Sequence, residues 1–207
     1  MNEIELELYK KGYDYIFGVD EVGRGSLFGD VTACAIILPK YFHILDVKDS
    51  KKLSSKKKEY LNDIMMSYCI DYSICCIDNK TIDEINIKQA TKLAMKDAIT
   101  NLLQKNKIST DKIIAIVDAE RLDLPIDQIS LNHADDLIHH VSCASIVAKV
   151  YRDNLCNEWD KLYPQYKLYK NKGYGTAEHI ELIRKYGVSD MHRKSFLNNI
   201  LRTKKYE

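Results

Sequence analysis

The stretch YIFGVDEVGRGSLFGDVTACAIIL, residues 15–38, decides the fold. Its first part, Tyr15 to Val22, is rich in aromatic and branched side chains, which favour a β-strand. Its last part, Val31 to Leu38, is nearly all apolar and stops before Pro39, so it predicts a second strand. Because only a glycine-rich turn separates the two strands, we expect them to form an antiparallel hairpin.

Further strands and helices alternate along the rest of the chain. Apolar runs predict strands, and helical spacing of apolar residues predicts helices: the strands are expected at Asp71–Ile77, Ile113–Val117 and Ile126–Leu131, and the helices over Ser55–Met66 and Ser142–Trp159. The pattern Thr81-Ile-Asp-Glu84 is a capping box, which we expect to open a long helix. This order predicts an α/β domain, in which helices cover the faces of a mixed sheet.

The length of 207 residues suits one main domain, expected over residues 1–163, with a helical extension over residues 164–207 packed on it. The extension is basic, with ten Lys/Arg against four Asp/Glu, although the net charge of the whole chain is only +1. A second basic group is formed by Lys51, Lys52, Lys56, Lys57 and Lys58. Such patches fit a protein that binds phosphates, and the alternative is that these lysines are solvated helix faces.

The sequence carries no signal for a membrane or for secretion. No apolar run approaches the length of a membrane span, and the N-terminus lacks the basic-then-apolar pattern of a secretory signal. We therefore expect a cytoplasmic protein. The six cysteines contain no CxxC pair, so we expect buried, reduced thiols rather than a zinc site.

Four acidic residues fall where strands end or helices begin. Asp20 and Glu21 end the first strand, Asp118 ends a buried apolar strand, and Asp135 lies shortly before the last long helix. Strand ends of an α/β sheet converge on one edge, where sites usually form. Carboxylates gathered there repel one another, are costly to bury unpaired, and need a cation between them.

Oxygen ligands of this kind suit hard divalent cations such as Mg²⁺. Two such ions suit in-line displacement at a phosphodiester, one activating the attacking water and the other stabilising the leaving oxygen. One difficulty is that adjacent strand residues point to opposite faces. Asp20 and Glu21 can share a site only if the strand twists or ends between them, and the following Gly23-Arg24-Gly25 favours such an ending.

At these residues the sequence resembles the ribonuclease HII family. The blocks that carry the resemblance are GVDEVGRG (18–25), DSKKL (49–53), VD (117–118), Asp135 with VSCASIVAKVYRD (141–153), GYGT (173–176) with His179, YG (186–187) and HRKSF (192–196). They occur in the family's order and cover nearly the whole chain. The resemblance implies an RNase H-like fold, a five-stranded mixed sheet flanked by helices, with residues 1–163 as the catalytic domain and 164–207 contributing to substrate binding.

The resemblance also implies an activity and a cofactor. It implies a monomer without an obligate protein partner that cleaves RNA in RNA–DNA hybrids and cuts 5′ to ribonucleotides embedded in duplex DNA. The products carry 3′-hydroxyl and 5′-phosphate ends, and two Mg²⁺ or Mn²⁺ ions act in the catalytic complex. The matching positions are Asp20, Glu21, Asp118 and Asp135 for the metal-binding acids, Gly23, Arg24 and Gly25 for the loop that recognises the ribonucleotide, and Tyr174 for the tyrosine that stacks on the sugar beside the cut.

These roles agree with the chemistry of the residues. A protein distinguishes RNA from DNA at one nucleotide by touching the 2′-hydroxyl, and glycines let backbone groups approach it closely. The charge of Arg24 can hold an adjacent phosphate. Lys51, Lys52 and Lys172 are candidates for further phosphate contacts. The alternative is that these lysines are merely solvated.

Some positions depart from the family pattern or leave a choice open. Ser26 stands where proline is often found, and Ala119 and Ala134 stand where glycine is common. Asp135 and Asp136 form a doublet, in which the spacing to the SCAS block favours Asp135. The nearby acids Glu120 and Asp123 are interpreted as surface residues.

Three rival functions remain to be weighed. The first is another nuclease or recombinase of the same fold class, against which the glycine loop and Tyr174 argue. The second is a non-catalytic nucleic-acid-binding protein, in which the carboxylates would be structural and no cleavage would occur. The third is a dinucleotide-binding enzyme, but Gly23-Arg-Gly25 lacks a third glycine at the required spacing.

Overall fold

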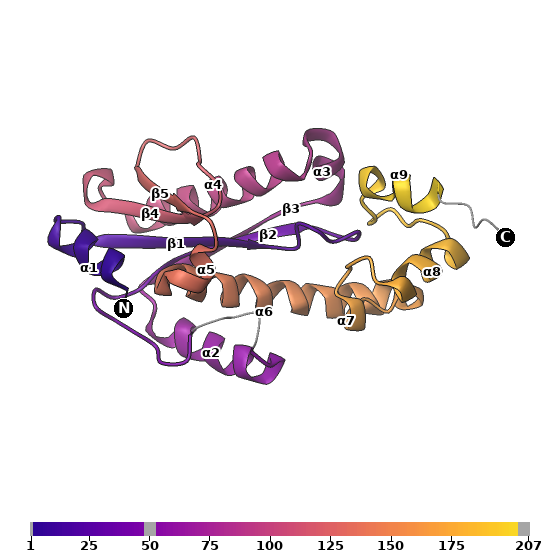
Figure 1. The fold of residues 1–207 in the computed structure, drawn as a ribbon, viewed down its shortest axis with the longest axis horizontal. Helices are drawn as coiled ribbons and strands as arrows, with labels where there is room; N and C mark the ends of the chain where they lie inside the picture. Colours follow the sequence, from indigo (N-terminus) through magenta and orange to yellow (C-terminus); the bar gives the residue numbers. More distant parts are fainter. Residues whose placement is uncertain (1, 48–52, 203–207) are drawn as a thin grey trace.

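The computed structural model describes residues 2–47 and 53–202. Within these ranges five strands form one mixed sheet in the order β3-β2-β1-β4-β5 (Figure 1). The strands are β1 (Tyr15–Val22), β2 (Val31–Ile37), β3 (Asp71–Ile77), β4 (Ile113–Asp118) and β5 (Asp127–Leu131). β1 is antiparallel to β2 and parallel to β4, so the predicted hairpin and the mixed sheet are confirmed.

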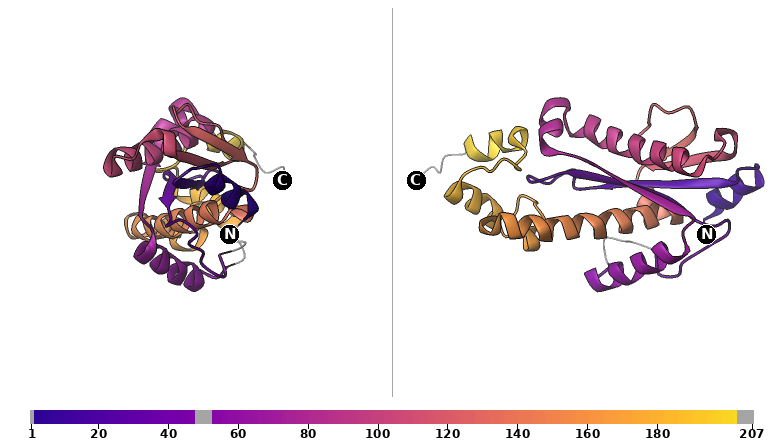
Figure 2. Two further views of the ribbon diagram at one scale, coloured as in Figure 1. Left: turned by 90° about the vertical axis from the view of Figure 1, so that its left-hand side faces the viewer. Right: turned by 180° about the vertical axis from the view of Figure 1, so that it is seen from behind.

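Helices cover both faces of this sheet, as the end-on view in Figure 2 shows. The α-helices are α1 (Glu3–Lys10), α2 (Ser55–Tyr68), α3 (Asn79–Ile85), α4 (Ile87–Asn106), α5 (Ala134–Leu137), α6 (His139–Leu162), α7 (Leu168–Asn171), α8 (Ala177–Tyr186) and α9 (Lys194–Arg202). α4 packs on one face of the sheet, while α6 and α2 pack on the other (Figure 1). None of the helices within the described ranges is long and apolar enough to cross a bilayer.

Strand alternation places the two halves of the core. Phe17 and Val19 of β1 pack in the cluster that contains the apolar face of α4. Gly18, between them, faces α6, and a Cβ atom at this position would lie 2.2 Å from the backbone of His140. The absence of a side chain at Gly18 therefore lets α6 approach β1 directly, which fixes the helix beside the end of the strand.

The capping-box prediction is wrong. Asp78 rather than Thr81 begins a helix, since its side chain accepts a hydrogen bond from the Thr81 N–H, and this helix, α3, stops at Ile85. Asn86 then adopts a left-handed φ of 67° and caps α4 with its own side chain. The chain changes direction at Asn86 because asparagine tolerates this conformation and satisfies the first N–H groups of the next helix.

The expectation for the cysteines holds in part. All six are free thiols. Cys34, Cys143 and Cys156 are buried, whereas the other three are only half-buried. β3, which carries two of these three, is an edge strand, and its side chains are only partly covered.

The C-terminal segment packs against the loop that follows β1. Leu27 and Phe28 of this loop share a hydrophobic cluster with Tyr166, Leu168 and Ile183. Isolated β-bridges join Ser26 to Tyr174 and Phe28 to His192. The loop is therefore enclosed by the C-terminal segment, while the proposed domain boundary after residue 163 stays a prediction.

Candidate active site

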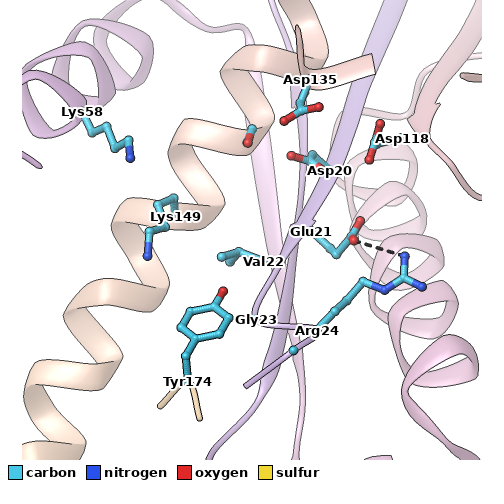
Figure 3. Close-up of a pocket in the computed structure, with 12 residues that line it drawn as sticks. Asp20, Glu21, Val22, Gly23, Arg24, Lys58, Asp118, Asp135, Lys149 and Tyr174 are labelled. Atoms are coloured by element: carbon cyan, nitrogen blue, oxygen red, sulfur yellow. Dashed lines mark hydrogen bonds and ion pairs between the residues drawn. The ribbon is translucent and has the colours of Figure 1, made fainter. Parts of the chain in front are cut away.

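The site begins where β1 and β4 stop pairing. Their parallel ladder ends at the pair Val19 and Val117. Asp20 and Asp118 come directly afterwards, and alternation puts both on the face that also carries Gly18. Their carboxylates therefore lie side by side at the end of the sheet (Figure 3).

Glu21 joins this pair without any break in the strand. β1 continues through Val22, with Glu21 paired to Ala33 of β2, so the expectation that the strand ends between Asp20 and Glu21 is wrong. Beyond Val19, however, β1 has no β4 neighbour, and its side chains border an open edge. Carboxylate oxygens of Asp20, Glu21 and Asp118 lie within 4.8 Å of one another.

The fourth predicted acid reaches the same cavity from α5. Asp135 is buried and lines the cavity with the other three acids, whereas Asp136 is exposed and lines a different hollow. The Asp118 carboxylate accepts a 2.7 Å hydrogen bond from the Ala134 N–H, which ties the start of α5 to the end of β4. The Ser142 hydroxyl donates to the Asp135 carbonyl and ties α5 to α6.

Burial and mutual repulsion shift the titration of these acids. Burial raises the pKa of Asp20 well above its ordinary value, and the charge of Glu21 adds to the rise, while a hydrogen bond with Ser145 opposes it. Burial also raises the pKa of Glu21 to about 7, although the cation of Arg24 opposes the rise. Buried carboxylates that repel one another favour either a proton or a cation between them.

The acids have the donor set that a hard divalent cation requires. They offer carboxylate oxygens from three separate elements around one cavity. Glu21 Oε2 is buried and has no hydrogen-bond partner among the described residues. A cation held here would satisfy this oxygen and remove the repulsion that raises the pKa values, so the residues fit a metal centre.

The predicted recognition residues line the same cavity of about 430 Å³. Gly23, Arg24 and Gly25 form the turn after β1, and Tyr174 faces this turn from the C-terminal segment (Figure 3). The Arg24 guanidinium lies 3.4 Å from the Glu21 carboxylate. The structure thus brings together all eight residues that the sequence singled out.

Four further residues at the site were not among the predicted site residues, although Lys58 belongs to the second basic group. Glu120, interpreted from sequence as a surface residue, is buried, and its carboxylate lies 3.5 Å from Arg24 Nη2, so that interpretation is wrong. Asp123 is exposed, as expected. Ser145 also lines the cavity. So do the lysines Lys58 and Lys149 (Figure 3).

The lysines proposed as phosphate contacts have different outcomes. Lys51 and Lys52 lie outside the described residues. Lys172 donates a 2.9 Å hydrogen bond to the side chain of Asn157 and so already has a partner within the protein. Lys58 and Lys149 line the cavity together with the acids, and Lys149 Nζ lies 2.6 Å from Asp153 Oδ1.

Solved structures show the same fold. They include a chain of the PCNA:RNase HII complex from Archaeoglobus fulgidus (TM-score 0.72, 21% identity, covering 92% of this chain and 98% of that chain). They also include ribonuclease H2 from Pyrococcus horikoshii OT3 (TM-score 0.72, 24% identity, 90% and 96% covered). Bst-RNase HIII in complex with Mn²⁺ is similar as well (TM-score 0.70, 18% identity, 88% and 66% covered). These structures share the RNase H fold with this chain, in which clustered carboxylates line the cavity at the end of the sheet.

Comparison of sequences identifies the family. The family model for ribonuclease HII matches residues 17–199. Ribonuclease HII of Alkaliphilus oremlandii is 48% identical over 201 residues, which cover 96% of this chain and 98% of the relative. Ribonuclease HII of Caldicellulosiruptor saccharolyticus is 49% identical, with 97% and 95% covered. The chain belongs to the ribonuclease HII family, whose members are ribonuclease H endonucleases.

Proposed function

We propose that this protein cleaves the RNA strand of RNA–DNA hybrids and also cuts on the 5′ side of single ribonucleotides embedded in duplex DNA. Water attacks the phosphorus, the bond to the 3′-oxygen of the preceding nucleotide breaks, and this oxygen leaves and takes up a proton. The products carry 3′-hydroxyl and 5′-phosphate ends. One observation carries the proposal: the acids, the Gly23–Gly25 loop and Tyr174 line a single cavity.

Asp20, Glu21, Asp118 and Asp135 are the proposed ligands of two Mg²⁺ or Mn²⁺ ions. When bound, such ions supply charge stabilisation at the reacting phosphate and lower the pKa of water. The protein contributes the positions of the four carboxylates. Asp118 is oriented by the Ala134 N–H, and Asp20 by its hydrogen bond with Ser145. Bst-RNase HIII, a protein of the same fold, has been solved in complex with Mn²⁺, which supports a divalent cation as the cofactor.

The other end of the cavity is proposed to recognise the ribonucleotide. Gly25 leaves room for a nucleotide, because a Cβ atom there would meet only the Tyr174 ring, at 3.9 Å. A sugar seated there would lie between the loop backbone and this ring, and a tyrosine ring suits stacking. Lys58 and Lys149 line the cavity on the α2 and α6 side and are proposed to hold phosphates of the substrate strand.

A cleavage assay tests the proposed function. The substrate is an end-labelled DNA duplex with one internal ribonucleotide, incubated with Mg²⁺, with Mn²⁺ or with EDTA, next to a matched RNA–DNA hybrid. We expect metal-dependent cutting of both substrates and a product that ends 5′ to the ribonucleotide. Cutting of the hybrid alone would leave the acids as assigned and refute the role of the loop and Tyr174. No cutting of either substrate would refute the proposed activity.

Oligomeric state, location and the role of the C-terminal segment complete the proposed function. We propose a monomer that acts in the cytoplasm without an obligate protein partner, its basic segment 164–207 contributing to substrate binding. The Archaeoglobus fulgidus structure contains PCNA bound to its RNase HII. Sedimentation of the purified protein, alone and with a ribonucleotide-containing duplex, tests the proposed stoichiometry.

A further inference from the structure

Arg193 is a buried cation that holds the backbone of the recognition loop. It is fully buried, and its guanidinium donates to three carbonyls of the segment after β1. Nη1 donates to Gly23 O at 2.8 Å and to Arg24 O at 3.0 Å, and Nε donates to Gly29 O at 2.8 Å. The Arg193 N–H also donates to Leu27 O at 2.9 Å. One residue of the C-terminal segment thus fixes both ends of the loop.

These bonds determine where the loop's N–H groups point. In a trans peptide the C=O and the following N–H point in opposite directions. Because Arg193 captures the carbonyls of Gly23 and Arg24, the N–H groups of Arg24 and Gly25 point away from it. Neither N–H has an acceptor among the described residues. Gly23, Arg24 and Gly25 all line the cavity, so two free donors are available to a hydroxyl group seated there.

Arg152 of α6 holds the same loop from the other side. Its Nη2 donates to the Ser26 hydroxyl at 2.9 Å and to Phe28 O at 3.1 Å. Its Nη1 donates to Lys172 O at 2.9 Å, two residues before Tyr174. The guanidinium carbon lies 5.8 Å from the centre of the Tyr174 ring. Arg152 therefore connects the loop to the segment that carries Tyr174.

The Arg152 and Arg193 side chains fill the space beside the loop after β1. A Cβ atom at Gly23, where φ is +90°, would lie 2.2 Å from Arg152 Nε. Burial, and then the charge of Arg152, lower the pKa of Arg193 to about 9, so it remains a cation near neutral pH. Arg193 Nη2 is buried without a partner among the described residues. Burying two cations is costly, and the bonds that both guanidinium groups donate to the loop, together with the nearby charge of Asp30, offset this cost.

We propose that Arg193 and Arg152 are positioning residues for ribonucleotide recognition: they hold the N–H groups of Arg24 and Gly25 and the ring of Tyr174 in the arrangement that reads one 2′-hydroxyl. The inference rests on the proposed function, because it concerns the same cavity. It assigns specificity to two side chains that do not line the cavity and are not exposed to solvent.

The test compares two substrates for each variant. kcat/KM is measured for a duplex with one ribonucleotide and for an RNA–DNA hybrid, with Arg193→Gln, Arg193→Lys and Arg152→Lys. The single ribonucleotide offers one 2′-hydroxyl, whereas the hybrid offers many, so loss of loop geometry harms the first substrate more. Since bonds from a charged donor are among the stronger ones, we expect the ratio of the two kcat/KM values to fall about tenfold. The lysine variants keep the charge but cannot span two carbonyls as a guanidinium does.

A matched control separates specificity from folding. Arg184→Gln removes an exposed arginine of α8 whose guanidinium donates to Ile200 O, and we expect it to leave the ratio unchanged. If the lysine variants lower both kcat/KM values by the same factor, the two arginines have a merely structural role and the inference is overturned. Wild-type kcat/KM values in these variants, on both substrates, overturn it as well. If the wild-type protein cuts hybrids but no single ribonucleotide, the proposed function fails, and the inference with it. If the wild-type protein cuts both and the ratio does not change in the variants, only the inference fails.

Discussion

Arg24 Nη1 lies 3.4 Å from Glu21 Oε1, so a residue of the recognition loop forms an ion pair with an acid of the proposed metal centre. The second nitrogen of the same guanidinium, Nη2, lies 3.5 Å from Glu120. The side chain of Arg24 is 37% exposed, while those of both acids are 10% exposed. The loop that is proposed to contact substrate therefore also sets the charge of Glu21.

Removal of Arg24 should change the pH dependence of cleavage. The pKa of Glu21 is raised to about 7 by burial, with Arg24 opposing the rise. Without this cation the pKa rises further, so at subsaturating Mg²⁺, where a proton and the metal ion compete for Glu21, Arg24→Gln should move the acid limb of the cleavage rate to higher pH by roughly one unit. The profile is measured from about pH 6 to 9 at saturating substrate and subsaturating Mg²⁺, with Arg184→Gln as the control. An acid limb at the wild-type pH would show that the ion pair does not govern the titration of Glu21.

Asp20→Asn should have opposite effects on activity and on stability. Loss of a proposed metal ligand should reduce kcat by about 10³-fold or more. The folded-state pKa of Asp20 is raised, so the metal-free folded protein binds this proton more tightly than the unfolded chain, and stability falls as the pH rises above the unfolded value. The amide removes that loss and should stabilise the metal-free protein at pH 7.

Urea unfolding of the metal-free protein at about pH 5 and pH 8, with and without Mg²⁺, measures this effect. Added Mg²⁺ should stabilise the wild-type protein at pH 8 and have little effect on the variant. Asp123→Asn, at an exposed acid nearby, is the control and should change neither quantity. Full activity of Asp20→Asn, or lower stability of its metal-free form, would contradict the assignment.

The choice between Asp135 and Asp136 as the fourth proposed metal ligand can be tested directly. Asp135 is buried in the cavity, whereas Asp136 is exposed outside it. We expect Asp135→Asn to reduce kcat about 10²-fold or more, and Asp136→Asn to change it less than about twofold. The two variants change the same chemical group one residue apart, so each is the other's control. The reverse order of the two effects would move the fourth ligand to Asp136.

The sheet was predictable because its signals are local. Strand β3 and the β1–β2 hairpin carry apolar and branched runs bounded by turn residues, and their predicted extents agree with the structure to within a residue. The break at Asn86 was not predictable in this way. It depends on one left-handed residue between two helical stretches, and the apolar spacing of α4 continues across that region without a visible signal.

Residue patterns alone predicted the site where acids lie at the ends of strands, whereas Gly23, Arg24, Gly25 and Tyr174 followed from the family resemblance. Asp20 and Asp118 follow from strand ends, and the parallel register brings them together. Glu120 was missed because its place depends on the turn at Ala119, where φ is +54° and the Glu120 N–H bonds back to Asp118 O. That turn directs Glu120 inward toward Arg24, and nothing in the local sequence distinguishes it from an exposed loop.

The buried pair Glu5 and His140 predicts a pH-dependent contribution to stability. Glu5 of α1 accepts hydrogen bonds from the ring and the N–H of His140 at the start of α6. Although burial alone would raise it, these bonds and the charge of His140 lower the pKa of Glu5 to about 2. A lowered pKa stabilises the folded protein above the unfolded value near 4.5, and this contribution is lost as the pH falls toward 2.

Glu5→Gln should therefore lower the free energy of unfolding by about 3 kcal/mol at pH 7 and by much less near pH 3. Denaturant unfolding at the two pH values measures the difference. Glu7→Gln, on the exposed side of the same helix, is the control and should have little effect at either pH. An equal loss at both pH values would show that the pair contributes by packing rather than by charge.

Tyr174→Ala should impair cleavage at a single ribonucleotide more than cleavage of a hybrid. Tyr174 lies between Gly173 and Gly175, and its ring faces the cavity opposite the Gly23–Gly25 loop (Figure 3). Stacking on an aromatic ring contributes about 1–3 kcal/mol, which corresponds to roughly a 5- to 150-fold loss in kcat/KM. Tyr174→Phe keeps the ring and should retain most of the activity.

Tyr169→Ala, at an exposed tyrosine of the neighbouring helix α7, controls for loss of an aromatic side chain from this segment. The Tyr174 N–H and carbonyl hold the turn through Asn171 and His179, and these backbone bonds persist in the alanine variant. A loss that is equal on both substrates, with reduced stability, would assign Tyr174 to packing. A loss confined to the single ribonucleotide, absent in Tyr174→Phe, would require the ring itself to contact the nucleotide beside the cut.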